Sequence, residues 1–176
     1  MLSADHHSPT GRSRRTPLGA KSDALAKQFE AKAQEAAAIL EKLSEADWTK
    51  VTAAEKWTVG VTAHHLASVL EPIAGIVTAI VSGQSLGNFT GAMVDEMNAK
   101  HAKEHAHCTK AETIALQRKG AAAAAAVVRG LSDDQLGKSA TVFTDAPPMT
   151  AEQVVTSGLI THIDEHFGSI RETVGN

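Results

Sequence analysis

The sequence is poor in aromatic residues and in cysteine. Only 3% of its 176 residues are aromatic, tyrosine is absent, and much of the 43% apolar content is alanine. Alanine is the strongest helix former and lets helices pack closely, so the composition favours a helical protein. Cys108 is the single cysteine, which excludes an internal disulfide and permits a reducing cytoplasm, the location we expect.

Strong charge and long apolar runs are also missing. The formal net charge of −3 provides no basic footprint for nucleic acid, so we expect no nucleic-acid partner. No apolar run approaches the ~20 residues of a membrane span, and the N-terminus lacks the apolar segment of a secretory signal. We therefore also expect no membrane partner.

The chain divides into a short aperiodic stretch and a long helical one. Residues 1–20 are rich in serine, proline and glycine, and we predict a disordered tail whose arginines remain solvated. Residues 21–176 show apolar residues at three- and four-residue steps. This spacing predicts helices over 22–43, 58–81, 90–105, 109–129 and 150–173. With no convincing strand pattern, we predict an all-α four-helix bundle with short extra helical pieces.

Three histidines are the candidate metal ligands. His162 and His166 are four residues apart and share one face of the last helix, a face that is otherwise apolar. In the second helix, helical phase turns His65 rather than His64 toward the core. His65 lies there on a predicted inward stripe with Val69, Ile73, Ile76 and Ile80. A buried imidazole needs a partner, and a divalent metal would provide one. Three protein ligands with open positions are typical of a reactive metal site, and imidazoles suit zinc, nickel or iron equally.

A second group of histidines allows more than one interpretation. His101, His105 and His107 lie among lysines and a glutamate, so we predict a solvated helix end. The one-turn spacing of His101 and His105 also fits a second metal site. In a third alternative, Asn98 or His101 lines the mouth of the first site.

Other polar residues near the candidate ligands have less specific interpretations. Asp164 and Glu165 are expected to be exposed helix charges, and helical phase turns Asp164 away from the ligands. A carboxylate often orients a ligating histidine, but the sequence does not identify one here. Cys108 lies in a polar stretch, which argues against a catalytic thiol. Trp57 is expected to anchor the end of the bundle and Arg171 to make a surface contact.

Three segments together resemble the DinB-like superfamily, which includes mycothiol-dependent maleylpyruvate isomerases and related thiol transferases. They are residues 43–48 (LSEADW), 57–66 (WTVGVTAHHL) and 162–171 (HIDEHFGSIR). Their order and spacing, over roughly residues 22–176, make the resemblance more specific than any single motif does.

The resemblance implies a four-helix bundle with a divalent ion near one end, held by the second and last helices. The family's second-helix ligand matches His65, eight positions after Trp57, and its C-terminal ligands match His162 and His166. Some isomerase-like members have a glutamate in place of one C-terminal histidine. The family also usually has glutamine after the glycine, where this chain has Ser169.

Two functions follow from these expectations. The first is a metal-dependent enzyme of the thiol S-transferase or isomerase type. Its cofactor would be a low-molecular-weight thiol, and its substrate an unknown small molecule. In a variant of this function, the enzyme is a hydrolase. The second is a non-catalytic, metal-stabilised helical bundle acting as a binding or stress-related dimer. The alanine run 121–126 offers a close-packed face, so we expect a homodimer. Space beside the metal would distinguish the two functions.

Overall fold

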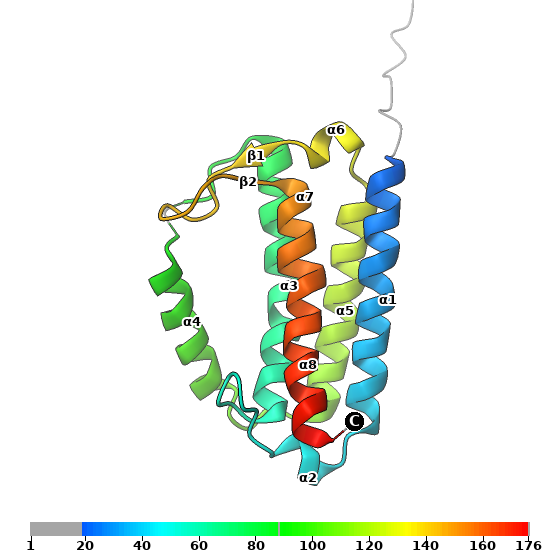
Figure 1. The fold of residues 1–176 in the computed structure, drawn as a ribbon, viewed down its shortest axis with the longest axis vertical. Coiled ribbons are helices and arrows are strands. Elements are labelled where there is room, and N and C mark those ends of the chain that lie inside the picture. Colours follow the sequence, from blue (N-terminus) through cyan, green and yellow to red (C-terminus); the bar gives the residue numbers. More distant parts are fainter. Residues whose placement is uncertain (1–18, 88, 176) are drawn as a thin grey trace, which may run out of the picture.

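The computed structural model describes residues 19–87 and 89–175, and helices dominate it (Figure 1). Four long rods make the bundle: α1 (Ala20–Lys42), α3 (Val59–Ser82), α5 (Lys110–Arg129), and a last rod of α7 (Ala151–Val154), η1 (Val155–Thr161) and α8 (His162–Val174). The remaining elements are α2 (Glu45–Trp48), α4 (Gly91–Glu104), α6 (Asp133–Leu136), β1 (Ser139–Ala140) and β2 (Met149–Thr150). The predicted all-α four-helix bundle is confirmed.

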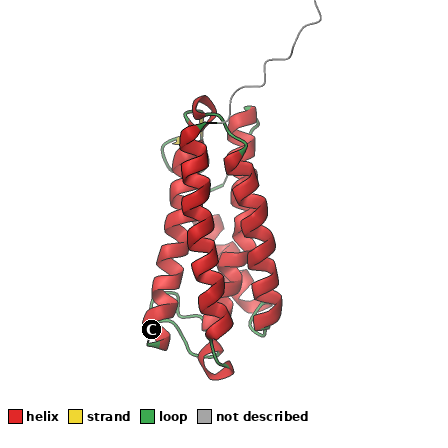
Figure 2. Cartoon of the chain, turned by 90° about the vertical axis from the view of Figure 1, so that its right-hand side faces the viewer, coloured by secondary structure: helices red, strands yellow, loops and turns green. Residues whose placement is uncertain are grey.

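The rods lie side by side, as two views at right angles show (Figures 1 and 2). In Figure 1, α3 and α5 run in one direction, whereas α1 and the last rod run in the other. The long connection from α3 through α4 returns the chain to the end at which α3 began, and α4 stands beside the bundle. The predicted tail, residues 1–20, lies outside the described residues except at its end, where α1 already begins at Ala20.

Side-chain caps fix the helix starts where the sequence placed them. Thr58 accepts a hydrogen bond from the Val61 amide at 3.2 Å at the start of α3. Thr109 and Thr150 form reciprocal capping boxes with residues three positions later, at the starts of α5 and α7. Each cap satisfies amides that have no partner within the helix, which explains why these boundaries were predictable.

The buried face of α3 differs in phase from the prediction. The residues that it buries deepest between its neighbours include Leu66, Leu70, Ala74 and Val77. Three members of the predicted stripe are only partly buried: Val69, Ile73 and Ile76. The reason is the close approach of α5, where a Cβ added to Gly120 would lie 3.2 Å from the Leu70 Cβ. The small residue Gly120 lets α5 approach the face of α3 that carries Leu66 and Leu70, so this leucine face is buried.

Two features were not predicted. Ser139–Ala140 pairs antiparallel with Met149–Thr150, but strands of two residues are too short to show an alternating pattern. The last rod was predicted as one α-helix, yet Val155–Thr161 forms a π-helix directly before His162. Such widened turns are rare and occur often at functional sites.

Helix α3 is long and apolar enough, by length and composition alone, to cross a membrane. This is weak evidence, because the core helix of a bundle passes the same test. Here α3 is the helix that packs between α5 and the last rod, and its leucine face is buried there.

Candidate metal centre

The bundle brings together the three histidines predicted as metal ligands. His65 on α3 meets His162 and His166 on α8, and one ring nitrogen of each lies within 4.8 Å of the others. The ring centroids are 5.5 Å apart for His65 and His162, 5.2 Å for His65 and His166, and 4.4 Å for His162 and His166. We call these three residues the first cluster.

Local structure holds the first cluster in place. His65 lies in the second turn of the capped helix α3 and is 5% exposed. His162 is the first residue of α8, directly after the π-helix, and His166 follows one turn later. The Trp57 ring meets His65 edge-on at 5.4 Å, so this tryptophan packs against the cluster as well as at the bundle end.

A carboxylate that sequence reasoning missed orients His166. The Nδ1 of His166 donates to Glu55 Oε1 at 2.8 Å, which leaves Nε2 available to a different partner. The Ser169 hydroxyl donates to Glu55 Oε2 at 2.7 Å. Ser169 stands where the family usually has glutamine, and its contact gives this position a role in supporting a candidate ligand.

Glu55 is presented by a tight loop. The Thr52 amide donates to the Trp57 carbonyl at 2.8 Å, the Lys56 amide donates to the Thr52 carbonyl at 3.2 Å, and Lys56 adopts a φ of 61°. Burial alone would raise the pKa of Glu55, but hydrogen bonds from Ser169, Thr52 and His166 outweigh it and lower the pKa. The side chain therefore remains a carboxylate and continues to accept the proton of His166.

We expect Glu55→Gln to weaken metal binding about 10–100-fold, the usual cost of losing a partner that orients a ligand. The amide removes the negative charge that holds the His166 tautomer, while its shape is preserved. Zinc affinity would be measured by competition with a chromophoric chelator. Glu35→Gln is the matched control, because Glu35 is exposed and pairs with Arg171. Equal affinities for the two variants would contradict the role given to Glu55.

Two histidines of the first cluster, His65 and His162, are uncharged at neutral pH. Burial, followed by the neighbouring imidazoles, lowers the pKa of His65 to about 3, and burial with His166 lowers the pKa of His162 to about 4. Neutral imidazoles are the form that binds a metal. His162 Nε2 is buried and has no hydrogen-bond partner among the described residues. A buried nitrogen without a partner, beside two further ring nitrogens, fits a metal ion.

The depressed pKa of His65 predicts that the metal-free protein loses stability in acid. Between the ordinary pKa of 6.5 and the folded value of about 3, the unfolded chain binds more protons than the folded one. Stability is therefore retained above pH 6.5 and lost as the pH falls below it, by about 2 kcal/mol at pH 5. Urea unfolding in chelator at pH 7 and pH 5 would measure this loss. His65→Gln is expected to show a smaller loss, and equal losses would contradict the assignment.

Most other predicted residues lie away from the first cluster. Asp164 points away and pairs with Lys32 at 2.5 Å, as helical phase predicted. Arg171 makes the expected surface contact, with Glu35 at 3.1 Å. Cys108 is half-buried, and burial raises the pKa of its thiol, which disfavours the nucleophilic form.

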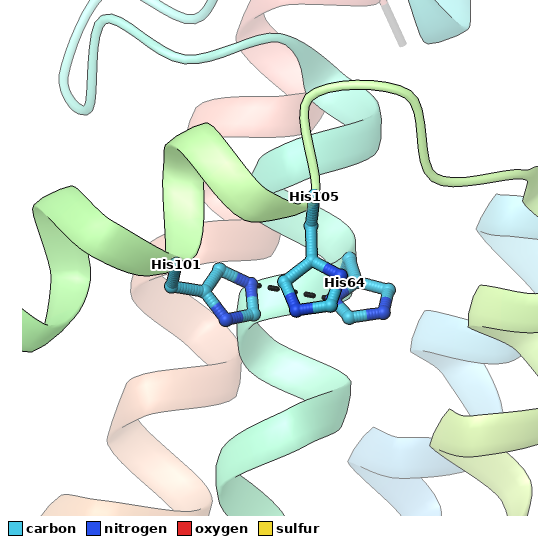
Figure 3. A group of neighbouring side chains, drawn as sticks. All are labelled: His64, His101 and His105. Atoms are coloured by element: carbon cyan, nitrogen blue, oxygen red, sulfur yellow. Dashed lines mark hydrogen bonds between the residues drawn. The ribbon is translucent and has the colours of Figure 1, made fainter.

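The prediction that the histidines at the C-terminal end of α4 are solvated is wrong for two of the three. His101 and His105 are half-buried and meet His64, a residue that helical phase had placed off the ligand stripe (Figure 3). His107 alone is exposed. Phase along one helix could not show this, because α4 supplies the contact. The His101 ring lies 5.4 Å from that of His65, in agreement with the alternative that placed His101 beside the first site.

Two surface cavities of the described residues lie elsewhere. One, of about 380 Å³, is lined by residues of α1 and α5, and the other, of about 480 Å³, by the loop before β2 and by η1. Neither is lined by a histidine of the first cluster.

Comparison with known proteins gives one family match. A family model described as the DinB superfamily matches residues 28–170, a stretch that begins within α1, ends within α8 and contains the whole first cluster. No curated protein and no solved structure matches the chain.

Proposed function

The chain belongs to the DinB superfamily, and on that premise we propose that it binds a divalent metal ion through His65, His162 and His166 and uses it in catalysis. Membership and the geometry of the three rings are compatible with metal binding. The observation that carries the proposal is the buried Nε2 of His162, which has no hydrogen-bond partner in the part of the chain that the structure describes and lies in a group of three histidines whose ring nitrogens are within 4.8 Å of one another. Zinc, nickel and iron all suit this imidazole set.

The residues of the chain would bind and orient such an ion. Glu55 accepts the Nδ1 proton of His166 and so keeps Nε2 free as a ligand. Burial keeps His65 and His162 neutral, which removes competition from protons at neutral pH. A divalent ion held by three protein ligands would supply Lewis-acid chemistry at its open positions, lowering the pKa of a thiol or water there.

We propose a thiol transfer or isomerisation that uses a low-molecular-weight thiol. Glu55 is already engaged by Ser169 and His166, so it is not free to act as a general base. Cys108 has a raised thiol pKa and lies outside the first cluster, so it does not supply a nucleophile. An external thiol that binds at the centre would provide the missing nucleophile, and an electrophilic small molecule would be the substrate. In the hydrolase variant, water takes the place of the thiol.

Cobalt-substituted protein provides the test. Addition of a small thiol is expected to produce a thiolate-to-cobalt charge-transfer band, and a panel of thiols and electrophiles is expected to reveal turnover. His162→Ala should abolish the turnover, whereas His107→Ala, which changes an exposed histidine outside the cluster, should preserve it. A loaded protein that gives no band and remains inert toward the panel would contradict the proposed catalysis.

A non-catalytic, metal-stabilised bundle is the second candidate function. The observation that favours it is the position of the His101 ring, whose centroid lies 5.4 Å from that of His65, so this side chain occupies space beside the first cluster. A cobalt spectrum that is insensitive to thiols, together with full metal loading, would support this candidate over the enzyme.

We also propose that the protein is a cytoplasmic homodimer. The alanine-rich helix α5 buries Ala124 and Ala125 in the bundle but exposes Ala122, Ala123 and Ala126. Of these small side chains, Ala122 lines the groove between α1 and α5, where a second copy would pack closely. Light scattering is expected to give a dimer mass for the wild type and a monomer mass for Ala122→Glu, and a monomeric wild type would contradict the proposal.

A further inference from the structure

Three histidines outside the first cluster meet where α4 approaches α3 (Figure 3). His64 Nδ1 and His101 Nε2 share a hydrogen bond of 3.2 Å, and His64 stacks on His105 with ring centroids 4.0 Å apart. The rings of His101 and His105 are 4.5 Å apart. One nitrogen of each ring lies within 4.8 Å of the others. We call these three residues the second cluster.

The second cluster lies at the C-terminal end of α4, a helix that otherwise makes few buried contacts with the bundle. Helix α4 contributes no buried residue, and Met93 and Met97 on it are exposed. Its first end is tied to the loop before β2, where the Gly91 amide donates to Asp145 Oδ2 at 3.2 Å. At its other end, His101 and His105 provide the ring contacts with α3. These histidines therefore help to position the C-terminal end of α4, together with the Trp48 indole, which donates to the Cys108 carbonyl at 2.9 Å just after the helix.

The surroundings of the second cluster suit a bound cation. His101 and His105 lie at the C-terminus of α4, where the helix dipole favours positive charge. Glu104 and Glu112 add negative charge nearby. A divalent ion at this position would therefore meet partial and full negative charges as well as three ring nitrogens.

We propose that His64, His101 and His105 form a second divalent-metal site, separate from the first cluster, and that an ion bound there fixes the C-terminal end of α4 against α3. Three imidazoles select zinc or another ion of similar ligand preference over magnesium or calcium, which prefer oxygen. The His101 ring lies 5.4 Å from that of His65. An ion bound at the second site would therefore also fix the position of His101 beside the first cluster.

Zinc stoichiometry tests the site. Wild-type protein, loaded with zinc and desalted, is expected to retain two equivalents by elemental mass spectrometry. His105→Ala and His162→Ala should each retain one, their combination none, and the exposed-histidine control His107→Ala two. A single equivalent that persists in His105→Ala overturns the second site and leaves the first intact. Loss of all zinc in His105→Ala alone also overturns it, because the two sites would not be separate. Wild type that binds no zinc overturns both.

Hydrogen exchange tests the effect on α4 without relying on activity. With free zinc at ten times the dissociation constant of the second site, amide exchange over residues 91–104 is expected to slow about tenfold. His105→Ala should show no such protection, although its first cluster still binds zinc. His105→Gln gives a second variant in case alanine disturbs the helix end. Equal protection in the wild type and both variants would overturn the role in fixing α4.

Discussion

Loading the metal-free protein with zinc is expected to raise its melting temperature by about 8–16 °C. Free zinc at a thousand times its dissociation constant adds about 4.1 kcal/mol of stability when only the folded state binds. In a protein of this size, each kcal/mol shifts the melting temperature by about 2–4 °C. The folded chain holds His65 beside the His162 nitrogen that has no hydrogen-bond partner among the described residues, whereas about a hundred positions separate the two residues along the unfolded chain.

This experiment requires a background in which only the first cluster responds. His64→Ala removes one ligand of the second cluster and leaves the first complete. Calorimetric scans with chelator and with buffered zinc would then compare this variant with the same variant carrying His65→Ala. The increase should persist in the former and disappear in the latter. An equal increase in both would show that zinc stabilises the protein elsewhere.

Phe29→Ala is expected to lower the free energy of unfolding by about 3–5 kcal/mol, the range for removing a buried phenylalanine ring. Phe29 on α1 is 0% exposed and lies in the hydrophobic core, where neighbouring helices cannot move far enough to fill the space. Metal affinity should remain unchanged, because Phe29 belongs to the apolar core and not to either histidine cluster.

Urea unfolding at neutral pH would measure the loss, with Phe89→Ala as the matched control. Phe89 is 40% exposed, so its truncation should change stability by about 0.5 kcal/mol or less. Comparable losses for the two variants would contradict the core packing described for α1.

Local and periodic features were predictable from the sequence. Thr58, Thr109 and Thr150 cap helices that begin where the sequence predicted, since a cap depends on residues within one turn. The pairing of His162 with His166 also follows from helical spacing, and His65 follows from phase and from the family motif.

The remaining features depend on contacts between distant segments. Glu55 reaches His166 across 111 positions, from a loop that has no periodicity and no motif of its own. His64 lies off the predicted stripe and gains its partners only because α4 returns beside α3. The π-helix before His162 has no simple sequence signal, although Gly158, whose added Cβ would lie 3.0 Å from Ile73, marks a close approach there.

Metal content of the first cluster is the measurement that tests the central claim most directly. Elemental mass spectrometry would be applied to zinc-loaded, desalted His64→Ala, and to the same variant carrying His65→Ala or His162→Ala. The proposed centre predicts one equivalent in the first protein and none in the other two. No metal in His64→Ala, or an equivalent that survives the loss of His65 and of His162, would contradict it.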